Sequence, residues 1–307
     1  MPVNNKVIVI GALNYDVCLK LKKLPEEGET NFADSVEYCS GGKGGNQAVQ
    51  AAKLGLRTCM FGCIGNDLSG AFLKENLEHF GVDTAYLRVI DGSSGMSVAQ
   101  SLYDGGVRAS VVRGANGAVD QTDVDAAAGI MEAGDIVVLQ LEIPVSVAEY
   151  AICKAKEKGG YVILNAAPAA PVSEEVLKKV DLLIVNEVEA GFYAGCKIDS
   201  VGRAELEIHR MAERCGGSCI VTLGKAGSVL RTDGKSLHIP SKQVKAVEST
   251  GAGDSYIGGI CWALLNGMDL FHAAAFATCC SAKTVCRTGG QPAMPSLSEA
   301  MAMYQKE

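Results

Sequence analysis

The chain has 307 residues, of which 48% are hydrophobic and 6% aromatic, and it contains 36 glycines. This length and composition predict a single α/β domain over residues 1–307 with a sizeable buried core, and they argue against disorder. The net charge of −7 argues against a nucleic-acid partner and against an anionic membrane surface, since both select for clustered lysine and arginine.

Residues 6–12 form the first apolar run, which is too short to span a membrane and lacks the basic start and cleavage site of a signal peptide. We therefore expect a cytoplasmic protein. The twelve cysteines match no zinc or redox spacing and the four histidines are scattered singly, so structural thiols and packing histidines are expected.

Short β-branched runs recur along the chain and predict buried strands over residues 7–10, 59–64, 136–141, 161–164, 182–185 and 219–223. Between most of them, apolar residues at helical spacing predict helices over residues 46–54, 71–80, 145–158 and 204–215. Because strands alternate with helices, the pattern indicates a mostly parallel sheet covered by helices on both faces.

Two segments, residues 13–40 and 95–112, break this rhythm because they alternate like strands with no helix between them. Both leave the main sheet near its start and return to it. They are therefore predicted to pair into a small second sheet that acts as a lid, as insertions in the one domain. The alternative is two unrelated surface hairpins.

Asn14 and Asp16 follow the first predicted strand, at the edge where open α/β sheets bind ligands. A carboxylate can accept hydrogen bonds from two vicinal hydroxyls, which is a good way to bind a sugar. From the residues alone, a helix-capping role for either side chain is an equal alternative.

The glycine-rich segment Ser40–Asn46 precedes a helix that is expected to begin near Gln47. It lacks the lysine followed by serine or threonine that a Walker loop needs. Lys43 and Asn46 supply donors and acceptors suited to a polyhydroxyl ligand. A plain glycine-rich entry to a helix is the alternative.

Two further motifs follow strands in the second half of the chain. Asn186–Glu189 begins a predicted helix, where Glu189 could hold hydrated Mg²⁺ near a nucleotide. The alternative is a capping box formed by the two terminal residues of this motif. Thr222–Gly227 is a turn that either borders a nucleotide or simply connects a hairpin.

The sharpest motif is Ser249–Ser255, followed by small and apolar residues that favour a helix. Glycines before a helix let backbone N–H groups converge on an anion, and the helix dipole adds a positive field there. Asp254 lies in the first turn, where it could take a proton from an attacking hydroxyl. The alternative is a glycine turn with an ordinary acidic helix start.

Taken together, these motifs resemble the ribokinase family, the PfkB-type carbohydrate kinases, from about Val7 to Pro295. The two signatures are Gly41–Asn46 and Ser249–Asp254. Three shorter motifs fall between them in the family's order, namely Gly114–Asn116, Asn165–Pro168 and Asn186–Glu189. The resemblance implies a Rossmann-like sheet with a β lid that joins a homodimer. It also implies that ATP phosphorylates a sugar's primary hydroxyl, which for D-ribose is the 5-hydroxyl.

The resemblance also implies roles for individual residues. Asp254 is the catalytic base, and Gly251, Ala252 and Gly253 form the anion hole. The residues implied to bind the sugar, together with Asp254, are Asn14, Asp16, Gly42, Lys43, Gly44, Gly45, Asn46 and Glu142. Those implied to serve ATP and Mg²⁺, together with Gly253, are Asn186, Glu189, Thr222, Leu223, Gly224, Lys225, Ala226, Gly227 and, near the adenine, Thr278.

A monovalent cation site for K⁺ is implied beside the anion hole. Its aligned residues are Glu248, Thr250, Thr284, Arg287, Gly289 and Ala293. Members activated by K⁺ usually carry aspartate where this chain has Glu248. The extra methylene is expected to shift or weaken the site.

The nearest alternative function is another kinase of the same family, acting on deoxyribose, a fructose-type sugar or a nucleoside. An alternative of another class is a sugar sensor without catalysis, but a pure binder has no need of an anion hole beside Asp254. A nicotinamide dehydrogenase is disfavoured because no dinucleotide fingerprint follows the first strand.

Overall fold

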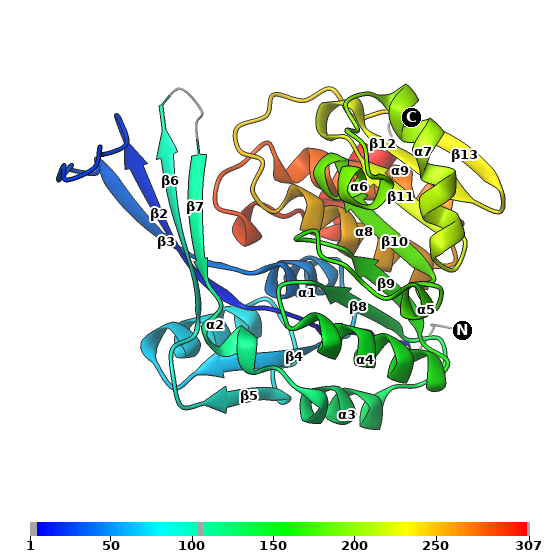
Figure 1. Ribbon diagram of the computed structural model, residues 1–307, viewed down its shortest axis with the longest axis horizontal. Helices are drawn as coiled ribbons and strands as arrows, with labels where there is room; N and C mark the ends of the chain where they lie inside the picture. The colour runs from blue at the N-terminus through cyan, green and yellow to red at the C-terminus, as the bar shows by residue number, and fades with distance from the viewer. Residues whose placement is uncertain (1–4, 104–106, 306–307) are drawn as a thin grey trace.

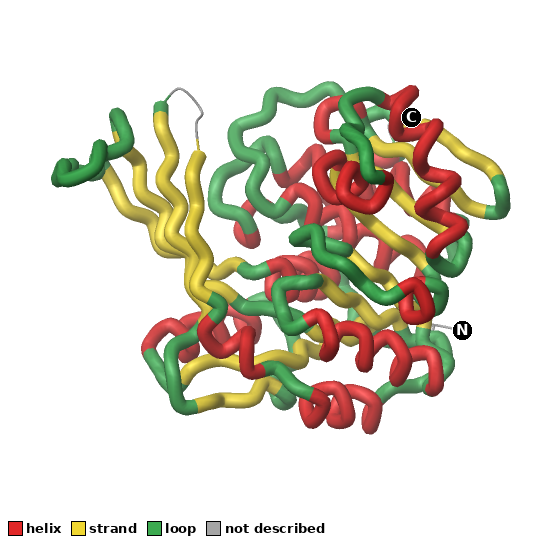
Figure 2. Tube along the Cα trace, viewed as in Figure 1, coloured by secondary structure: helices red, strands yellow, loops and turns green. Residues whose placement is uncertain are grey.

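The computed structural model describes residues 5–103 and 107–305, and its described strands form two sheets (Figures 1 and 2). The larger sheet has nine strands, in the spatial order β13 (Lys235–Ile239), β12 (Ser228–Thr232), β11 (Ser218–Thr222), β10 (Leu182–Asn186), β9 (Tyr161–Asn165), β8 (Ile136–Gln140), β1 (Val7–Ile10), β4 (Thr58–Gly65) and β5 (Leu87–Ile90). Neighbouring strands are parallel from β11 to β5, whereas β12 and β13 are antiparallel. The predicted mostly parallel sheet is confirmed.

Helices cover both faces of this sheet, as predicted (Figure 1). One face is covered by α3 (Gln121–Ile130), α4 (Val145–Glu157), α5 (Glu174–Leu177), α6 (Glu187–Ala194) and α7 (Val201–Arg214). The other is covered by α1 (Lys43–Lys53), α2 (Leu68–His79), α8 (Ala252–Leu265), α9 (Leu270–Thr284) and α10 (Leu297–Tyr304). The short 3₁₀ helices are η1 (Gly114–Ala118), η2 (Gly224–Ala226) and η3 (Gln291–Ala293). Within the described residues, no helix is long and apolar enough to cross a membrane.

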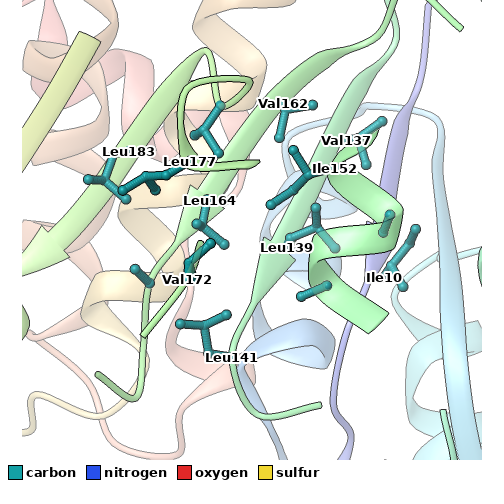
Figure 3. Packing of buried hydrophobic residues seen from close by; sticks show 14 of the residues in the cluster. Ile10, Val137, Leu139, Leu141, Ile152, Val162, Leu164, Val172, Leu177 and Leu183 are labelled. Carbon is teal, nitrogen blue, oxygen red and sulfur yellow. The ribbon is translucent and has the colours of Figure 1, made fainter. Parts of the chain in front are cut away.

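The core lies on both sides of the large sheet because its central strands carry apolar side chains on both faces. In β1, Ile8 and Ile10 enter one hydrophobic cluster, while Val7 and Val9 enter the cluster on the opposite face. Figure 3 shows the first cluster, where side chains of β8 and β9 pack against α4. Each fully buried side chain of this kind contributes about 1.5–3 kcal/mol to folding. The two clusters together fix the strand ends that carry the polar motifs.

The smaller sheet has the strand order β3 (Ser35–Gly41), β2 (Asn14–Leu21), β6 (Gly95–Leu102) and β7 (Val107–Val112). Strand β2 pairs antiparallel with β3 and parallel with β6, so the two segments meet in one sheet and are not unrelated hairpins. The expected second sheet is therefore present, and it projects from the main body (Figure 1). The connection over residues 104–106 lies outside the described residues. The action of the smaller sheet as a lid stays a prediction.

The first helix begins earlier than the sequence indicated. Helix α1 starts at Lys43 instead of near Gln47, directly after Gly42, which has a φ of 81°. Gly44 belongs to the first helical turn, where an added Cβ would lie 2.8 Å from the backbone nitrogen of Ala12. The glycines are therefore needed for a close approach of α1 to the chain after β1, and they do not form an extended loop.

Candidate active site

Four residues of the late glycine motif meet at the start of α8 and line one cleft. Gly251 is the residue before the helix and has a φ of 75°, a conformation that glycine adopts without a steric penalty. Ala252, Gly253 and Asp254 form the first turn. A helix start of this kind presents free backbone N–H groups and a positive dipole end. The arrangement suits a developing negative charge.

The cleft has a volume of about 830 Å³ and lies at the carboxyl ends of parallel strands, since Asn165, Asn186 and Thr222 are the last residues of β9, β10 and β11. That volume suits a nucleotide-sized ligand. The predicted site residues that line it are Lys43, Asn186, Glu189, Thr222, Gly224, Lys225, Gly227, Gly251, Ala252, Gly253, Asp254 and Thr278. The predicted residues outside its lining are Asn14, Asp16, Gly42, Gly44, Gly45, Asn46, Glu142, Leu223, Ala226, Glu248, Thr250, Thr284, Arg287, Gly289 and Ala293.

Asp254 is nevertheless in direct contact with the first glycine motif. Its Oδ2 accepts a hydrogen bond from Asn46 Nδ2 at 2.8 Å, and its Oδ1 accepts one from Gln47 Nε2 at 2.9 Å. Asp254 is only 8% exposed, so these contacts form in a largely dry environment. The two signatures that are far apart in the sequence therefore build one site.

Asp16 has an unsatisfied acceptor beside this site. Its Oδ1 is buried and has no hydrogen-bond donor among the described residues. Burial raises the pKa of Asp16 to about 7, and the nearby carboxylates of Glu142 and Asp254 add to the effect. Asn14 is buried and its Oδ1 accepts from Asn116 Nδ2 at 2.8 Å. The unpaired Oδ1 of Asp16 therefore fits a ligand that brings hydroxyl donors.

Lys43 lies among three carboxylates. Its backbone N–H donates to Glu142 Oε2 at 2.8 Å. Burial is the largest single effect on the Lys43 ammonium and acts to lower its pKa. The carboxylates of Asp254, Glu142 and Glu189 together outweigh burial, and the pKa lies above its ordinary value. Burial raises the pKa of Glu142, and Lys43 opposes this shift. A charged lysine thus lies at the wall of the cleft, beside Glu142.

The capping alternative for Asn186 and Glu189 is present in the structure. Asn186 Oδ1 accepts from the backbone N–H of Glu189 at 3.0 Å, and Glu189 Oε2 accepts from the backbone N–H of Asn186 at 2.8 Å. Burial raises the pKa of the Glu189 carboxyl. Both residues also line the cleft, so capping fixes a carboxylate at its wall.

The donor set fits a water-held Mg²⁺ better than a protein cage. Among the described residues, no group of three or more His, Cys, Asp or Glu side chains could enclose a metal. Mg²⁺ at nucleotide phosphates keeps several waters and needs one or two carboxylates. Glu189 at the cleft wall meets that requirement.

The turn over residues 222–227 is both a hairpin connection and a wall of the cleft. It joins β11 to the antiparallel β12, and the backbone N–H of Leu223 donates to the carbonyl of Gly227 at 2.8 Å. Thr278 is buried on α9, where its hydroxyl donates to the carbonyl of Ala274 at 2.8 Å. Its side chain therefore shapes the cleft while its hydroxyl is bonded within its own helix.

The residues aligned with a cation site lie on two adjacent segments. Glu248 Oε2 accepts from the backbone N–H of Gly289 at 3.1 Å, so the longer side chain still reaches the second segment. The Arg287 guanidinium pairs with Glu299, and the Thr284 hydroxyl lies 2.8 Å from Ser255 Oγ. These two residues would therefore offer backbone carbonyls. Carbonyl and carboxylate oxygens are ligands that hard cations prefer, so the donor set fits a monovalent cation.

Sequence reasoning missed Gln47, Gln140 and Gln291 as parts of the site. Gln140 gave a detectable signal, because it is a polar residue at the carboxyl end of a buried strand. Gln47 gave none, because its role depends on partners that are distant in sequence.

A helix start beside an acidic residue, facing a nucleotide-sized cleft at the strand ends, defines an α/β phosphotransferase. The chain belongs to the pfkB family of carbohydrate kinases, whose model matches residues 4–297. The predicted family membership and fold are confirmed, and the chain is a sugar kinase.

Similar proteins include a ribokinase from Haemophilus influenzae, which is 31% identical over 97% of both chains. A deoxyribokinase from Salmonella typhi is 30% identical over 95% of this chain and 96% of its own length. Among solved structures, an Arabidopsis thaliana ribokinase complexed with ribose and ATP matches with a TM-score of 0.89. It shares 27% identity and covers 98% of this chain and 99% of its own.

Proposed function

We propose that this sugar kinase transfers the γ-phosphoryl group of ATP to the 5-hydroxyl of D-ribose, giving ribose 5-phosphate and ADP. The observation that carries the proposal is the contact between Asp254 and Asn46, because it joins the anion hole to the motif assigned to the sugar. The ribokinase from Haemophilus influenzae and the structure with ribose and ATP support ribose as the acceptor.

Asp254 is the proposed general base. Its carboxylate accepts the proton of the sugar hydroxyl as the oxygen attacks the γ-phosphorus, and the bond to the leaving ADP oxygen breaks. The backbone N–H groups of Gly251, Ala252 and Gly253 stabilise the negative charge on the transferring group. In-line positioning supplies much of the rate, because the transfer needs little covalent chemistry from the protein.

Asp16 is the proposed anchor for the sugar. Its buried, unpaired Oδ1 accepts from ring hydroxyls, and Asn14 and Glu142 complete the contacts on that side. Gly42, Gly44 and Gly45 are proposed to contribute to the sugar site because they let α1 approach the chain after β1, which carries Asn14 and Asp16. Lys43 is proposed to bridge the sugar and the phosphates, because it lines the cleft and lies near Asp254, Glu142 and Glu189.

Mg²⁺ and K⁺ complete the proposed site. Asn186 and Glu189, with the turn over residues 222–227, are proposed to hold the nucleotide and hydrated Mg²⁺, which when bound neutralises phosphate charge. Glu248 and the backbone carbonyls of the facing segment are proposed to hold K⁺ beside the anion hole.

The smaller sheet is the proposed lid and dimer contact. One face carries Asp16. Because the negative charge of Asp254 helps to raise the pKa of the Asp16 carboxyl, we infer that this face lies toward the site. The opposite face carries Tyr15, which stacks on Tyr38, and Val36 and Tyr38 are 44% and 57% exposed. We propose that this apolar face pairs with a second copy, and that closure limits wasteful ATP hydrolysis. We also propose a cytoplasmic location, where ATP is available.

Deoxyribose is the second candidate acceptor, because the similar deoxyribokinase matches nearly as well as the ribokinases. The experiment measures ADP release from ATP and Mg²⁺ with ribose, deoxyribose, fructose or adenosine, in K⁺ or Na⁺. Turnover highest with ribose supports the proposal. A higher kcat/KM with another acceptor would identify that acceptor as the substrate in place of ribose. No turnover with any acceptor would contradict the proposed reaction.

A further inference from the structure

The carboxylate of Asp254 is held on both oxygens by side-chain amides from consecutive residues of α1. Gln47 donates to Oδ1 at 2.9 Å and Asn46 donates to Oδ2 at 2.8 Å. An ionised carboxylate is purely an acceptor, so two donors suit its charged form. Hydrogen bonds to an ionised group are also stronger than neutral ones and more directional.

Gln47 is itself oriented by a buried partner from the sheet. Gln140 Nε2 donates to Gln47 Oε1 at 2.7 Å, which fixes the oxygen end of the Gln47 amide away from Asp254. The nitrogen end also donates to Asn165 Oδ1 at 3.2 Å. Gln47 is 1% exposed and Gln140 is fully buried, so water does not compete for these bonds.

Asn46 is oriented in the same way from the other side. Gln291 Nε2 donates to Asn46 Oδ1 at 2.9 Å, and Asn76 Nδ2 donates to Gln291 Oε1 at 2.6 Å. Two amide chains, from β8 and from α2 through η3, therefore end on the two oxygens of one carboxylate. Neither amide of α1 can turn without breaking a buried hydrogen bond.

We propose that Gln47 is a positioning residue for catalysis, which holds the Asp254 carboxylate in a fixed plane. This inference rests on the proposed function and adds a residue to it. Gln47 is not among the described residues that line the cleft, so it acts through Asp254 and not on the substrates. Its removal is expected to misalign the base.

The competing explanation is that Gln47 merely satisfies a buried polar packing site. Gln50 provides a matched control, because it lies one turn further along the same helix and is fully buried. Gln50 accepts from the hydroxyl of Ser255, next to Asp254, at 2.7 Å and donates to the carbonyl of Pro295 at 3.1 Å. Loss of Gln50 thus disturbs the same helix pair without removing a donor to the base.

The experiment compares Gln47→Leu with Gln50→Leu by steady-state kinetics with ribose across the pH range. Gln47→Leu is expected to lower kcat roughly 10-fold or more while the KM for ribose changes by less than about 3-fold. Its kcat is expected to fall at a higher pH than in the wild type, because a donor to the ionised base is lost. Gln50→Leu is expected to leave the acid limb of the profile where it was.

A wild-type acid limb and kcat in Gln47→Leu would overturn the proposal, and so would an equal shift in Gln50→Leu. If Gln47→Leu does not fold, the isosteric Gln47→Glu replaces it, and there an unchanged acid limb overturns the proposal. If the wild type shows no sugar-dependent turnover, the proposed function fails separately. The crystal structure of the Gln47 variant then decides, since an unmoved Asp254 rotamer contradicts positioning and a changed rotamer supports it.

Discussion

Asn46 and Asp254 are 208 positions apart in the chain, yet Nδ2 of the first donates to Oδ2 of the second across 2.8 Å. The contact is possible because α1 and α8 pack very closely. At Gly258 of α8, an added Cβ would lie 2.5 Å from Cγ of Gln50 on α1. The two glycine motifs are therefore carried by one tightly packed helix pair, and rigid supporting elements hold a site geometry better than loops do.

Sugar affinity is expected to depend on pH through Asp16. Its pKa is raised from 3.8 to about 7 by burial and then by Glu142 and Asp254, and the ionised form accepts from sugar hydroxyls. Ribose affinity should be full above this pKa. It should weaken by up to about tenfold per pH unit as the pH falls below it. Calorimetric titration at a series of pH values checks this, and a flat profile would contradict the role of Asp16.

The same pKa has a consequence for stability with the opposite sign. Because folding raises the pKa of this acid, the stabilising contribution is fully present below pH 3.8 and is lost as the pH rises to about 7. Asp16→Asn should therefore gain stability relative to the wild type as the pH rises through this window. Urea unfolding of both proteins at each pH measures the difference, which should be constant above the window.

Gly44→Ala is expected to damage the site through the backbone. The new Cβ would lie 2.8 Å from Ala12 N and from the carbonyl carbon of Gly11, so the start of α1 must move. A cost of about 1–3 kcal/mol in the free energy of unfolding is expected, with a loss of kcat because Asn46 moves too. Gly202→Ala, in α7 with nothing within 4 Å of its Cβ, should instead stabilise by about 0.4–1 kcal/mol. Similar effects of both changes on urea unfolding would refute this account.

Activation by K⁺ is expected to depend on Glu248. Replacing K⁺ by Na⁺ should lower ribose-dependent ADP release in the wild type, and Glu248→Ala should remove most of that difference because an oxygen ligand is lost. Glu248→Asp, which restores the shorter side chain, should respond at lower K⁺ concentrations. An identical K⁺ response in the wild type and in Glu248→Ala would place the cation elsewhere.

The dimer contact is expected to be sensitive to charge on the outer face of the small sheet. Tyr38→Glu puts a carboxylate at a position that is 57% exposed in the single chain, so pairing through this face should weaken. Light scattering after size-exclusion chromatography should show the mass falling toward that of one chain. Phe271→Glu, at a 41% exposed aromatic on α9, is the control. A dimer that persists in Tyr38→Glu would point to a different interface.

The central strands were predictable because parallel strands buried on both faces are continuous apolar runs, as in β1, β8 and β10. The edge strand β13 was not, because its residues are mostly exposed and polar. Helix α9 was also missed, since its buried alanines and cysteines surround most of the helix and leave no amphipathic stripe. A local sequence pattern thus predicts an element only where it forms a continuous apolar run or an amphipathic stripe.

The site was predictable to the extent that its residues lie in glycine motifs with a physical purpose. Asp254 is recognisable from the sequence as a candidate site residue, because it lies in a first helical turn that follows a glycine turn. The amide chain from Gln140 through Gln47 is not, because each hydrogen bond joins elements that meet only after the sheet has formed. Tertiary contacts of this kind leave no local signature in one sequence.

The most direct test of the account is the turnover and ribose affinity of Asp254→Asn beside the wild type. Asparagine keeps the shape of the side chain but cannot accept the hydroxyl proton at neutral pH. Ribose-dependent ADP release should fall by at least roughly 100-fold, while the ribose dissociation constant measured by calorimetry changes by less than about 3-fold. A variant that keeps a tenth of the wild-type turnover would contradict the assignment of Asp254 as the general base.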